Sequence, residues 1–212
     1  MKKTLLLLSH QDDEVLSCGG LLLNRQDDNE VLVVTMFNRK YNYGKGLQGE
    51  EEETQAFLAA KKLLGYDHHL TLSLAEGEPH LHHYYDLLEL IEAQLRVFDP
   101  DEVVIHSEHD TNQDHRFMAE LCRIALRPAN LGSVSTILAC RGLEGTYPRA
   151  NHFEYMLKED LDTKLAAMQC YKRESREGNH PRSPQNIEAY HRLVGASCGY
   201  EFAEPYDLIM QR

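Results

Sequence analysis

Residues 5–14 read Leu5-Leu6-Leu7-Leu8-Ser9-His10-Gln11-Asp12-Asp13-Glu14, and this stretch decides the fold. The four leucines form a short unbroken apolar run, which is typical of a strand buried on both faces. The acidic residues that follow are typical of the first turn of a helix. His10, Asp12 and Asp13 therefore fall at the carboxyl end of a predicted strand. In open parallel sheets this edge binds ligands, because the strand-to-helix turns open there into a crevice.

Length, charge and cysteine content limit the class of protein. The chain has 212 residues and no linker-like stretch, so we expect one domain over residues 1–212. The net charge of -12 and the pI near 5.4 argue against nucleic acid as a partner. The apolar run over residues 5–8 is too short for a signal peptide or a membrane span, so we expect a cytoplasmic protein. Five widely spaced cysteines indicate neither a disulfide framework nor a Cys-x-x-Cys metal site.

Strands and helices are predicted to alternate along the chain. Apolar and β-branched runs predict further strands over residues 30–37, 68–72, 101–106, 135–140 and 206–210. Helical spacing of apolar residues predicts helices over residues 50–64, 84–95, 117–125, 161–172 and 183–194. This alternation favours an α/β class, with a Rossmann-like layered fold whose mostly parallel central sheet is flanked by helices.

A second polar cluster follows the strand predicted over residues 101–106. It reads Ser107-Glu108-His109-Asp110-Thr111-Asn112-Gln113-Asp114-His115-Arg116. Because both strands deliver their clusters to the same sheet edge, we expect His115 to lie beside His10 and Asp13. Two imidazoles and one carboxylate fit a catalytic zinc site, which takes three protein ligands and keeps one position open. Zinc lowers the pKa of bound water to about 7, and Asp12 would then be free to act as the general base.

Each candidate also has a structural interpretation. Asp12 or Asp13 equally suits the N-cap of the first helix, and His115 taken alone would be an ordinary polar residue in a first helical turn. His106 and His109 either support the ligands or are merely exposed. Asp114 either orients an imidazole or caps a helix. The coincidence of two clusters at neighbouring strand ends is what favours the metal hypothesis.

Two loops contain further polar residues. The stretch Asn38-Arg39-Lys40-Tyr41-Asn42-Tyr43-Gly44-Lys45-Gly46 follows a predicted strand. It is either a flexible substrate loop, with Asn38, Arg39 and Lys45 as candidate contacts, or a solvated loop without a role. His80, His82 and His83 suggest a metal site, but no cysteine or acid stands at ligand spacing. We therefore predict that these histidines lie on a surface loop.

Three stretches resemble the PIG-L (LmbE-like) zinc-dependent N-deacetylases, and the likeness extends over essentially the whole chain. Residues 8–14 resemble the family signature Pro-His-Pro-Asp-Asp-Glu. Residues 110–116, Asp-Thr-Asn-Gln-Asp-His-Arg, resemble the second motif, Asp-x-His-Pro-Asp-His-Arg. Near the C-terminus, Tyr200-Glu201-Phe202-Ala203-Glu204-Pro205-Tyr206 is similar to the family's Tyr-Ala-Glu-Ala-Phe.

The resemblance implies roles for the motif residues. His10, Asp13 and His115 would bind Zn²⁺, with another divalent metal such as Fe²⁺ as the alternative. Asp12 would be the general base, and Asp110 and Asp114 would support the ligands. The implied substrate is a small molecule, an N-acetylglucosamine-type conjugate that is free, nucleotide-linked or lipid-linked and that loses its acetyl group. A homo-oligomer is compatible with this assignment.

The chain departs from the family pattern at three places. Ser9 and Gln11 replace two prolines, which changes loop stiffness more than ligand chemistry. Asn112 replaces a histidine that assists the oxyanion or the leaving group. An amide donates a hydrogen bond to an oxyanion but cannot deliver a proton, so Asn112 would be a catalytic residue of limited capacity. Protonation of the leaving amine would then fall to Asp12, or to one of the other histidines, His106, His109 or His180.

The third departure concerns substrate binding. The family's substrate-contacting arginine before the acidic helix has no counterpart near Gln48 and Gly49, and Arg39, Lys40 or Lys45 would have to replace it. These departures keep an alternative open, namely a metal-binding protein that is inactive or acts on a different amide. A nucleotide-binding module ranks last, because no Gly-x-Gly-x-x-Gly sequence follows a predicted strand.

Overall fold

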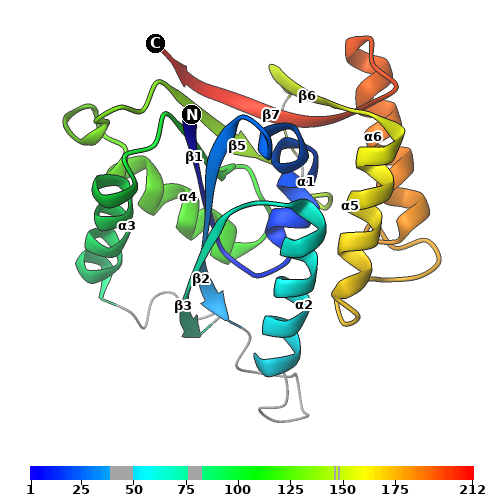
Figure 1. Ribbon diagram of the computed structural model, residues 1–212, viewed down its shortest axis with the longest axis horizontal. Coiled ribbons are helices and arrows are strands. Elements are labelled where there is room, and N and C mark those ends of the chain that lie inside the picture. The colour runs from blue at the N-terminus through cyan, green and yellow to red at the C-terminus, as the bar shows by residue number, and fades with distance from the viewer. Residues whose placement is uncertain (39–49, 76–82, 146, 148) are drawn as a thin grey trace.

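The computed structural model describes residues 1–38, 50–75, 83–145, 147 and 149–212 (Figure 1). Seven strands and six α-helices occur in this part of the chain. Their bounds are β1 (Lys2–Leu8), α1 (Asp13–Arg25), β2 (Asn29–Asn38), α2 (Glu50–Leu64), β3 (His68–Ala75), α3 (Tyr84–Phe98), β4 (Glu102–His106), α4 (Gln113–Ala125), β5 (Thr136–Cys140), β6 (His152–Met156), α5 (Lys158–Cys170), α6 (Pro184–Cys198) and β7 (Phe202–Gln211).

The strands form one sheet in the order β3-β2-β1-β4-β5-β7-β6. β1 lies at the centre and pairs in parallel with β2 on one side and with β4 on the other. β5 continues the parallel part, whereas β7 runs antiparallel to both β5 and β6. The chain leaves β1 toward β2 and later returns to the other side of β1 as β4. The carboxyl ends of β1 and β4 therefore flank the topological switch point, where α/β sheets bind ligands.

Two apolar cores cover the two faces of the sheet, as the alternation of side chains along β1 requires. Leu6 and Leu8 pack into a core with α1, α2, α5 and α6. Leu5 and Leu7 point the other way, into a core with α3 and α4. All four leucines have no solvent-exposed surface, which explains why the run is apolar without alternation. Figure 1 shows α3 and α4 on one side of the sheet and the remaining helices on the other.

This arrangement confirms the predicted layered α/β fold, with two differences in the C-terminal third. The short strand β6 was not predicted, because His152 and Glu154 interrupt its apolar pattern at the edge of the sheet. β7 begins at Phe202, four residues before the predicted strand. Pro205 lies inside β7 and pairs with Phe153 of β6. A proline usually interrupts a strand, but here the antiparallel pairing of β6 and β7 accommodates it.

A closed network of buried polar groups joins α1, α5 and β7. Glu204 forms an ion pair with Lys164, and both side chains are 1% exposed. The Glu204 carboxylate also accepts the N–H groups of Gly20 and Leu21 at 2.8 and 3.0 Å and the Tyr206 hydroxyl at 2.9 Å. Lys164 Nζ donates a further bond to a carbonyl of α1. We call these residues the closed network.

Glycine permits this close approach. A Cβ atom on Gly20 would lie 2.5 Å from Met156 Sδ and 3.0 Å from the Glu204 carboxyl carbon. Gly20 therefore permits α1 to pack against β6 and β7, and Gly19 lies against the Lys164 side chain of α5. Both glycines lie inside the helix and not in a strand-to-helix turn.

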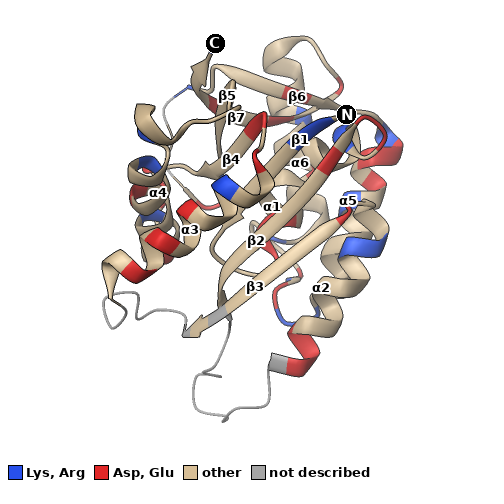
Figure 2. Cartoon of the chain, turned by 60° about the vertical axis from the view of Figure 1, so that its left-hand side comes forward, with Lys and Arg blue, Asp and Glu red and all other residues tan. Residues whose placement is uncertain are grey.

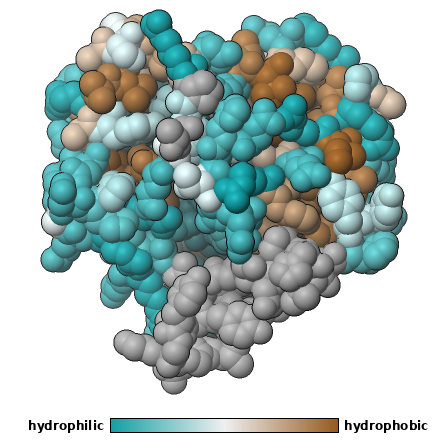
Figure 3. Space-filling model, turned by 180° about the vertical axis from the view of Figure 1, so that it is seen from behind, coloured by the Kyte–Doolittle hydropathy of each residue, from teal (hydrophilic) through white to brown (hydrophobic). Residues whose placement is uncertain are grey.

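Charged residues lie mainly on the helices and at the strand ends. In Figure 2 the charges of β1 and β2 are confined to their amino-terminal parts. The face seen in Figure 3 is mostly hydrophilic, with apolar residues in separate small patches. Among the described residues, no helix has the length and hydropathy that crossing a membrane requires.

Candidate active site

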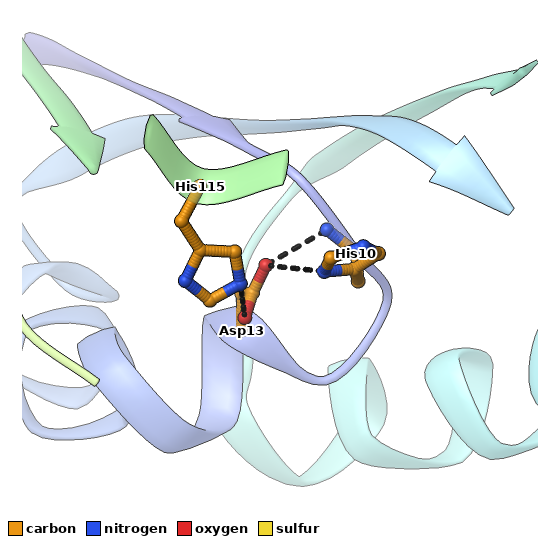
Figure 4. A group of neighbouring side chains, drawn as sticks. All are labelled: His10, Asp13 and His115. Atoms are coloured by element: carbon orange, nitrogen blue, oxygen red, sulfur yellow. Dashed lines mark hydrogen bonds and ion pairs between the residues drawn. The ribbon is translucent and has the colours of Figure 1, made fainter. Parts of the chain in front are cut away.

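Two strand-to-helix turns meet at the switch point and carry the polar motifs. The turn between β1 and α1 supplies His10, the first residue of α1 is Asp13, and the first turn of α4 supplies His115. The two imidazole rings lie 5.3 Å apart, centroid to centroid. One potential ligand atom from each of His10, Asp13 and His115 lies within 4.8 Å of the others. Figure 4 shows both rings turned toward the Asp13 carboxylate, and we call these three residues the ligand cluster.

Each imidazole of the ligand cluster is oriented by its own carboxylate. His10 Nε2 lies 3.0 Å from Asp114 Oδ2, and His115 Nδ1 lies 3.0 Å from Asp110 Oδ2. The inner nitrogens, His10 Nδ1 and His115 Nε2, lie farther from a carboxylate, at 3.5 Å and 3.2 Å from Asp13, so in each neutral ring we assign the hydrogen to the outer nitrogen. The inner nitrogens then direct their lone pairs toward the space beside Asp13. Carboxylates orient metal-binding histidines in this way.

Asp13 is the centre of the cluster. It accepts the backbone N–H of His10 at 2.8 Å, and its two oxygens lie 3.2 Å from His115 Nε2 and 3.3 Å from His106 Nε2. Burial opposes ionisation of Asp13, but the His115 and His106 rings and the hydrogen bonds lower its pKa well below the usual range. Asp13 is therefore a carboxylate at neutral pH, as a metal ligand must be.

The protonation of His10 is linked to the same carboxylates. Burial lowers the pKa of His10, but the hydrogen bonds to Asp114 and Asp13 outweigh this effect and raise it to about 10. A cation bound by His10 Nδ1 must therefore displace a proton. Two imidazoles and one carboxylate are a donor set that suits zinc and other first-row divalent metals, so the residues fit such an ion.

His106 lies beneath the ligand cluster. Its ring is 1% exposed and stacks on His115 with centroids 4.0 Å apart. His106 Nε2 accepts the backbone N–H of Ser9 at 2.9 Å, which joins the end of β4 to the turn after β1. Of the two interpretations left open, the buried position favours support of the ligands. His109, in contrast, is half-exposed, with 49% of its side chain accessible.

A second group with metal-ligand composition consists of His106, Asp110 and His115. Its donor atoms are already engaged. His106 Nε2 accepts from Ser9, and Asp110 accepts the Asn112 N–H and the Tyr147 hydroxyl at 2.8 and 2.7 Å. Burial opposes ionisation of Asp110, yet bonding to His115 keeps its pKa below the usual range. The group that contains His10 is therefore the better cation site.

Asp12 has an unusual backbone conformation, with φ 137° and ψ -23°. A residue other than glycine in this region costs roughly 1–3 kcal/mol and persists only where surrounding contacts enforce it. Asp12 stands at the N-cap position of α1, but its side chain makes no capping hydrogen bond. Its N–H donates to Glu14 Oε2 at 2.9 Å.

Burial and the neighbouring Asp13 raise the pKa of Asp12 to about 8, against the opposing effect of Arg182.

A cavity of about 240 Å³ lies next to the ligand cluster. Its lining includes Asp13 and His115 of the ligand cluster together with Asn112, Glu144 and Arg182. Arg182 Nη1 lies 3.3 Å from Asp12 Oδ2, so the guanidinium links the cavity wall to the candidate base. Sequence reasoning missed Arg182, because its position before α6 carries no motif that points to the sheet edge.

Asn112 has a structural role as well as the predicted position at the site. Its side-chain oxygen accepts the Asp114 N–H at 2.8 Å and caps α4. Asn112 also lines the cavity, and its side-chain NH2 group is the part that can donate to a ligand. The interpretation of Asp114 as a helix cap is wrong, because Asn112 is the N-cap and the Asp114 carboxylate bonds to His10.

The loop predictions are mostly untested. Arg39, Lys40 and Lys45 lie outside the described residues, and of Asn38 only the backbone at the end of β2 is described. His80 and His82 also lie outside the described residues, and His83 precedes α3 at its N-cap. His180 accepts the backbone N–H of Arg182.

Comparisons with known structures show the same fold at low sequence identity. N,N'-diacetylchitobiose deacetylase from Pyrococcus horikoshii is 17% identical with a TM-score of 0.82, over 99% of this chain and 84% of that chain. GalB, the 4-carboxy-2-hydroxymuconate hydratase from Pseudomonas putida KT2440, is 19% identical with a TM-score of 0.77, over 100% and 98%. The zinc-inhibited form of teicoplanin deacetylase Orf2 is 17% identical with a TM-score of 0.73, over 98% of both chains.

The family follows from the sequence match. No curated protein matches this chain. The sequence model of the PIG-L family, described as GlcNAc-PI de-N-acetylase, matches residues 5–126. This match spans more than half of the chain and contains both motifs of the ligand cluster. The chain therefore belongs to the PIG-L family, as its two motifs predicted.

Proposed function

We propose that this protein is a metal-dependent deacetylase that hydrolyses the N-acetyl amide of an amino sugar to acetate and a free amine. The observation that carries the proposal is the ligand cluster, in which Asp114 and Asp110 turn the inner nitrogens of His10 and His115 toward Asp13. Membership of the PIG-L family supports the reaction type. Two of the similar folds are deacetylases by name, and one of these acts on N,N'-diacetylchitobiose.

His10, Asp13 and His115 would hold the cation. The donor set suits Zn²⁺, with Fe²⁺ as the alternative. When bound, such an ion would acidify a water molecule and polarise the carbonyl of the amide. His106 supports this site from below, because its ring stacks on His115 and accepts a hydrogen bond from the turn that carries His10.

Asp12 would move the proton. As the general base it takes a proton from the attacking water. It then gives that proton to the nitrogen of the leaving amine as the C–N bond breaks, so amide and water become acetate and free amine. Asn112 donates a hydrogen bond to the developing oxyanion through its side-chain amide. Because Asn112 has no proton to give, Asp12 carries both steps.

Release of free amine by the metal-loaded protein tests the proposal. The protein is reconstituted with Zn²⁺ or with Fe²⁺ and offered free, nucleotide-linked and lipid-linked N-acetylglucosamine, and the released amine is quantified. We expect turnover of at least one substrate, its loss together with the bound metal in His10→Ala, and its retention in the control His68→Ala. His68 is a suitable control because it is 57% exposed at the start of β3.

A second candidate function follows from Asn112. If the protein binds one metal ion but releases amine from none of these sugars, the deacetylase proposal fails. The protein would then be a metal-binding family member that is inactive or acts on a different amide. The hydratase GalB has the same fold, so fold alone does not fix the reaction.

A further inference from the structure

Asp12 has an unusual backbone conformation, and one distant segment contacts both its side chain and its neighbour Glu14. Its φ of 137° lies in the region that favours glycine, yet the residue is an aspartate. Such a conformation persists only where neighbouring groups enforce it. The connection between α5 and α6, residues 171–183, reaches Asp12 by two separate routes.

The first route holds the backbone. The Asp12 N–H donates to Glu14 Oε2 at 2.9 Å, and the other oxygen of Glu14 accepts the Tyr171 hydroxyl at 2.5 Å. Glu14 has no exposed surface and Tyr171 is 2% exposed. Burying a carboxylate is costly unless hydrogen bonds compensate, and the interior of α1 would be packed more easily by an apolar residue. The position of Glu14 is explained by the two hydrogen bonds that it accepts.

The second route holds the side chain. Arg182 Nη1 donates to Asp12 Oδ2 at 3.3 Å. The same guanidinium is fixed by Glu174 Oε2 at 2.8 Å and by Glu144 Oε1 at 2.9 Å. Three carboxylates therefore surround one cation, which limits the rotamers of Arg182 and the direction in which the Asp12 carboxylate points.

We propose that Tyr171, Glu14 and Arg182 form a clamp that positions Asp12, with Tyr171 and Glu14 setting its backbone and Arg182 setting its carboxylate. None of the three is a catalytic residue. They act through Asp12, so their contribution to turnover rests on the proposed function. The enforced backbone conformation of Asp12 is independent of that function. A misplacement of a reacting group by about 1 Å costs on the order of 100-fold in rate, which is the effect that the clamp prevents.

Turnover of Tyr171→Phe tests the backbone route. This variant keeps the ring and removes the hydroxyl, and we expect kcat to fall about 10- to 100-fold while KM and the metal content stay unchanged. Tyr66→Phe is the matched control, because Tyr66 is also 2% exposed and its hydroxyl has no hydrogen-bond partner among the described residues. An unchanged kcat in Tyr171→Phe, or an equal fall in Tyr66→Phe, overturns the backbone route.

Chemical rescue tests the side-chain route. We expect Arg182→Ala to lower kcat and added guanidinium to restore part of it, with Arg182→Lys in between. Arg173→Ala is the control, because Arg173 lies in the same connection but pairs with Glu52 of α2. A loss that guanidinium does not restore, or a similar loss in Arg173→Ala, contradicts the role of Arg182.

A stability comparison needs no substrate and separates the clamp from the proposed function. Both Asp12→Gly and Asp12→Ala remove the carboxylate, but only glycine adopts a φ of 137° without strain. We expect Asp12→Gly to melt about 2–4 °C above Asp12→Ala. Equal melting temperatures, or a higher one for Asp12→Ala, contradict an enforced backbone. If wild-type protein turns over no substrate, the proposed function fails, and this comparison alone decides whether Asp12 is held under strain.

Discussion

The ligand cluster and the closed network are both built from buried ionisable groups, but they differ in how their hydrogen bonds are satisfied. In the closed network, Glu204 accepts four hydrogen bonds, and the cation that balances it is Lys164 of the same chain. In the ligand cluster, Asp13 faces imidazole nitrogens of His10 and His115, and a cavity opens beside it. A cluster with its own internal cation stabilises the fold, whereas metal-ligand groups beside a cavity are suited to exchange a proton for a cation from outside.

Asp12→Asn should have the largest effect on the ligand-cluster side of this comparison. The amide cannot take a proton, so we expect turnover to fall by about two to four orders of magnitude while one metal ion stays bound. Amine release and metal analysis measure both quantities. Asp27→Asn, in the exposed turn after α1, is the control. Near-normal turnover of Asp12→Asn would show that Asp12 is not the base.

Lys164→Met should have the largest effect on the closed-network side. It leaves the Glu204 carboxylate buried without its cation, which costs about 3–5 kcal/mol of the free energy of unfolding. Urea unfolding measures this loss, and the metal content of the folded variant should not change. Adding Glu204→Gln to Lys164→Met should recover part of the stability. A loss of metal in Lys164→Met would mean that the two clusters are coupled.

The closed network also predicts a dependence of stability on pH. Burial opposes ionisation of Glu204, but Lys164 and the hydrogen bonds lower its pKa below the ordinary value in the folded protein. The stabilisation is therefore fully present above the unfolded pKa of about 4.3 and is lost as the pH falls through the folded pKa. Denaturation curves of wild type and Glu204→Gln should converge below that range. A constant difference between them would contradict the assignment.

His106→Phe tests how much support the ligand cluster needs. Phenylalanine keeps the stacking on His115 but loses the hydrogen bond from Ser9, and we expect metal affinity to fall about 10- to 100-fold. Competition with a chelator measures the affinity. His109→Phe, in the half-exposed turn that follows β4, should leave the metal affinity unchanged.

Asn112→Ala should have the smallest effect on stability. It removes the cap of α4 and should cost about 1 kcal/mol in thermal or urea unfolding. Asn112→Asp keeps a capping oxygen and should retain that stability, but it loses the amide donor at the cavity. A fall in turnover in both variants would assign Asn112 to the reaction. Unchanged turnover would mean that Asn112 serves only as the N-cap of α4.

The sequence predicted most of the fold and the meeting of the two motifs, because both depend on local patterns. The leucine run marks the central strand, and each polar cluster follows a strand that ends at the same edge. β6 escaped prediction because an edge strand of five residues needs no long apolar run. Arg182 and Tyr171 could not be assigned from the sequence, because their roles depend on tertiary contacts. Arg182 contacts Asp12 across 170 residues of sequence, and Tyr171 contacts Glu14 across 157.

The cavity beside the ligand cluster is assembled from two parts of the chain. The PIG-L match ends at residue 126, and it contains every residue of the ligand cluster. The remaining 86 residues supply Glu144 and Arg182 of the cavity lining, and Tyr171, which contacts Glu14. A change in the second part would therefore alter the cavity and the contacts on Asp12 together, while the ligand cluster stays intact. A chimera joined near residue 126 would exchange part of the cavity lining and the clamp on Asp12 in one step.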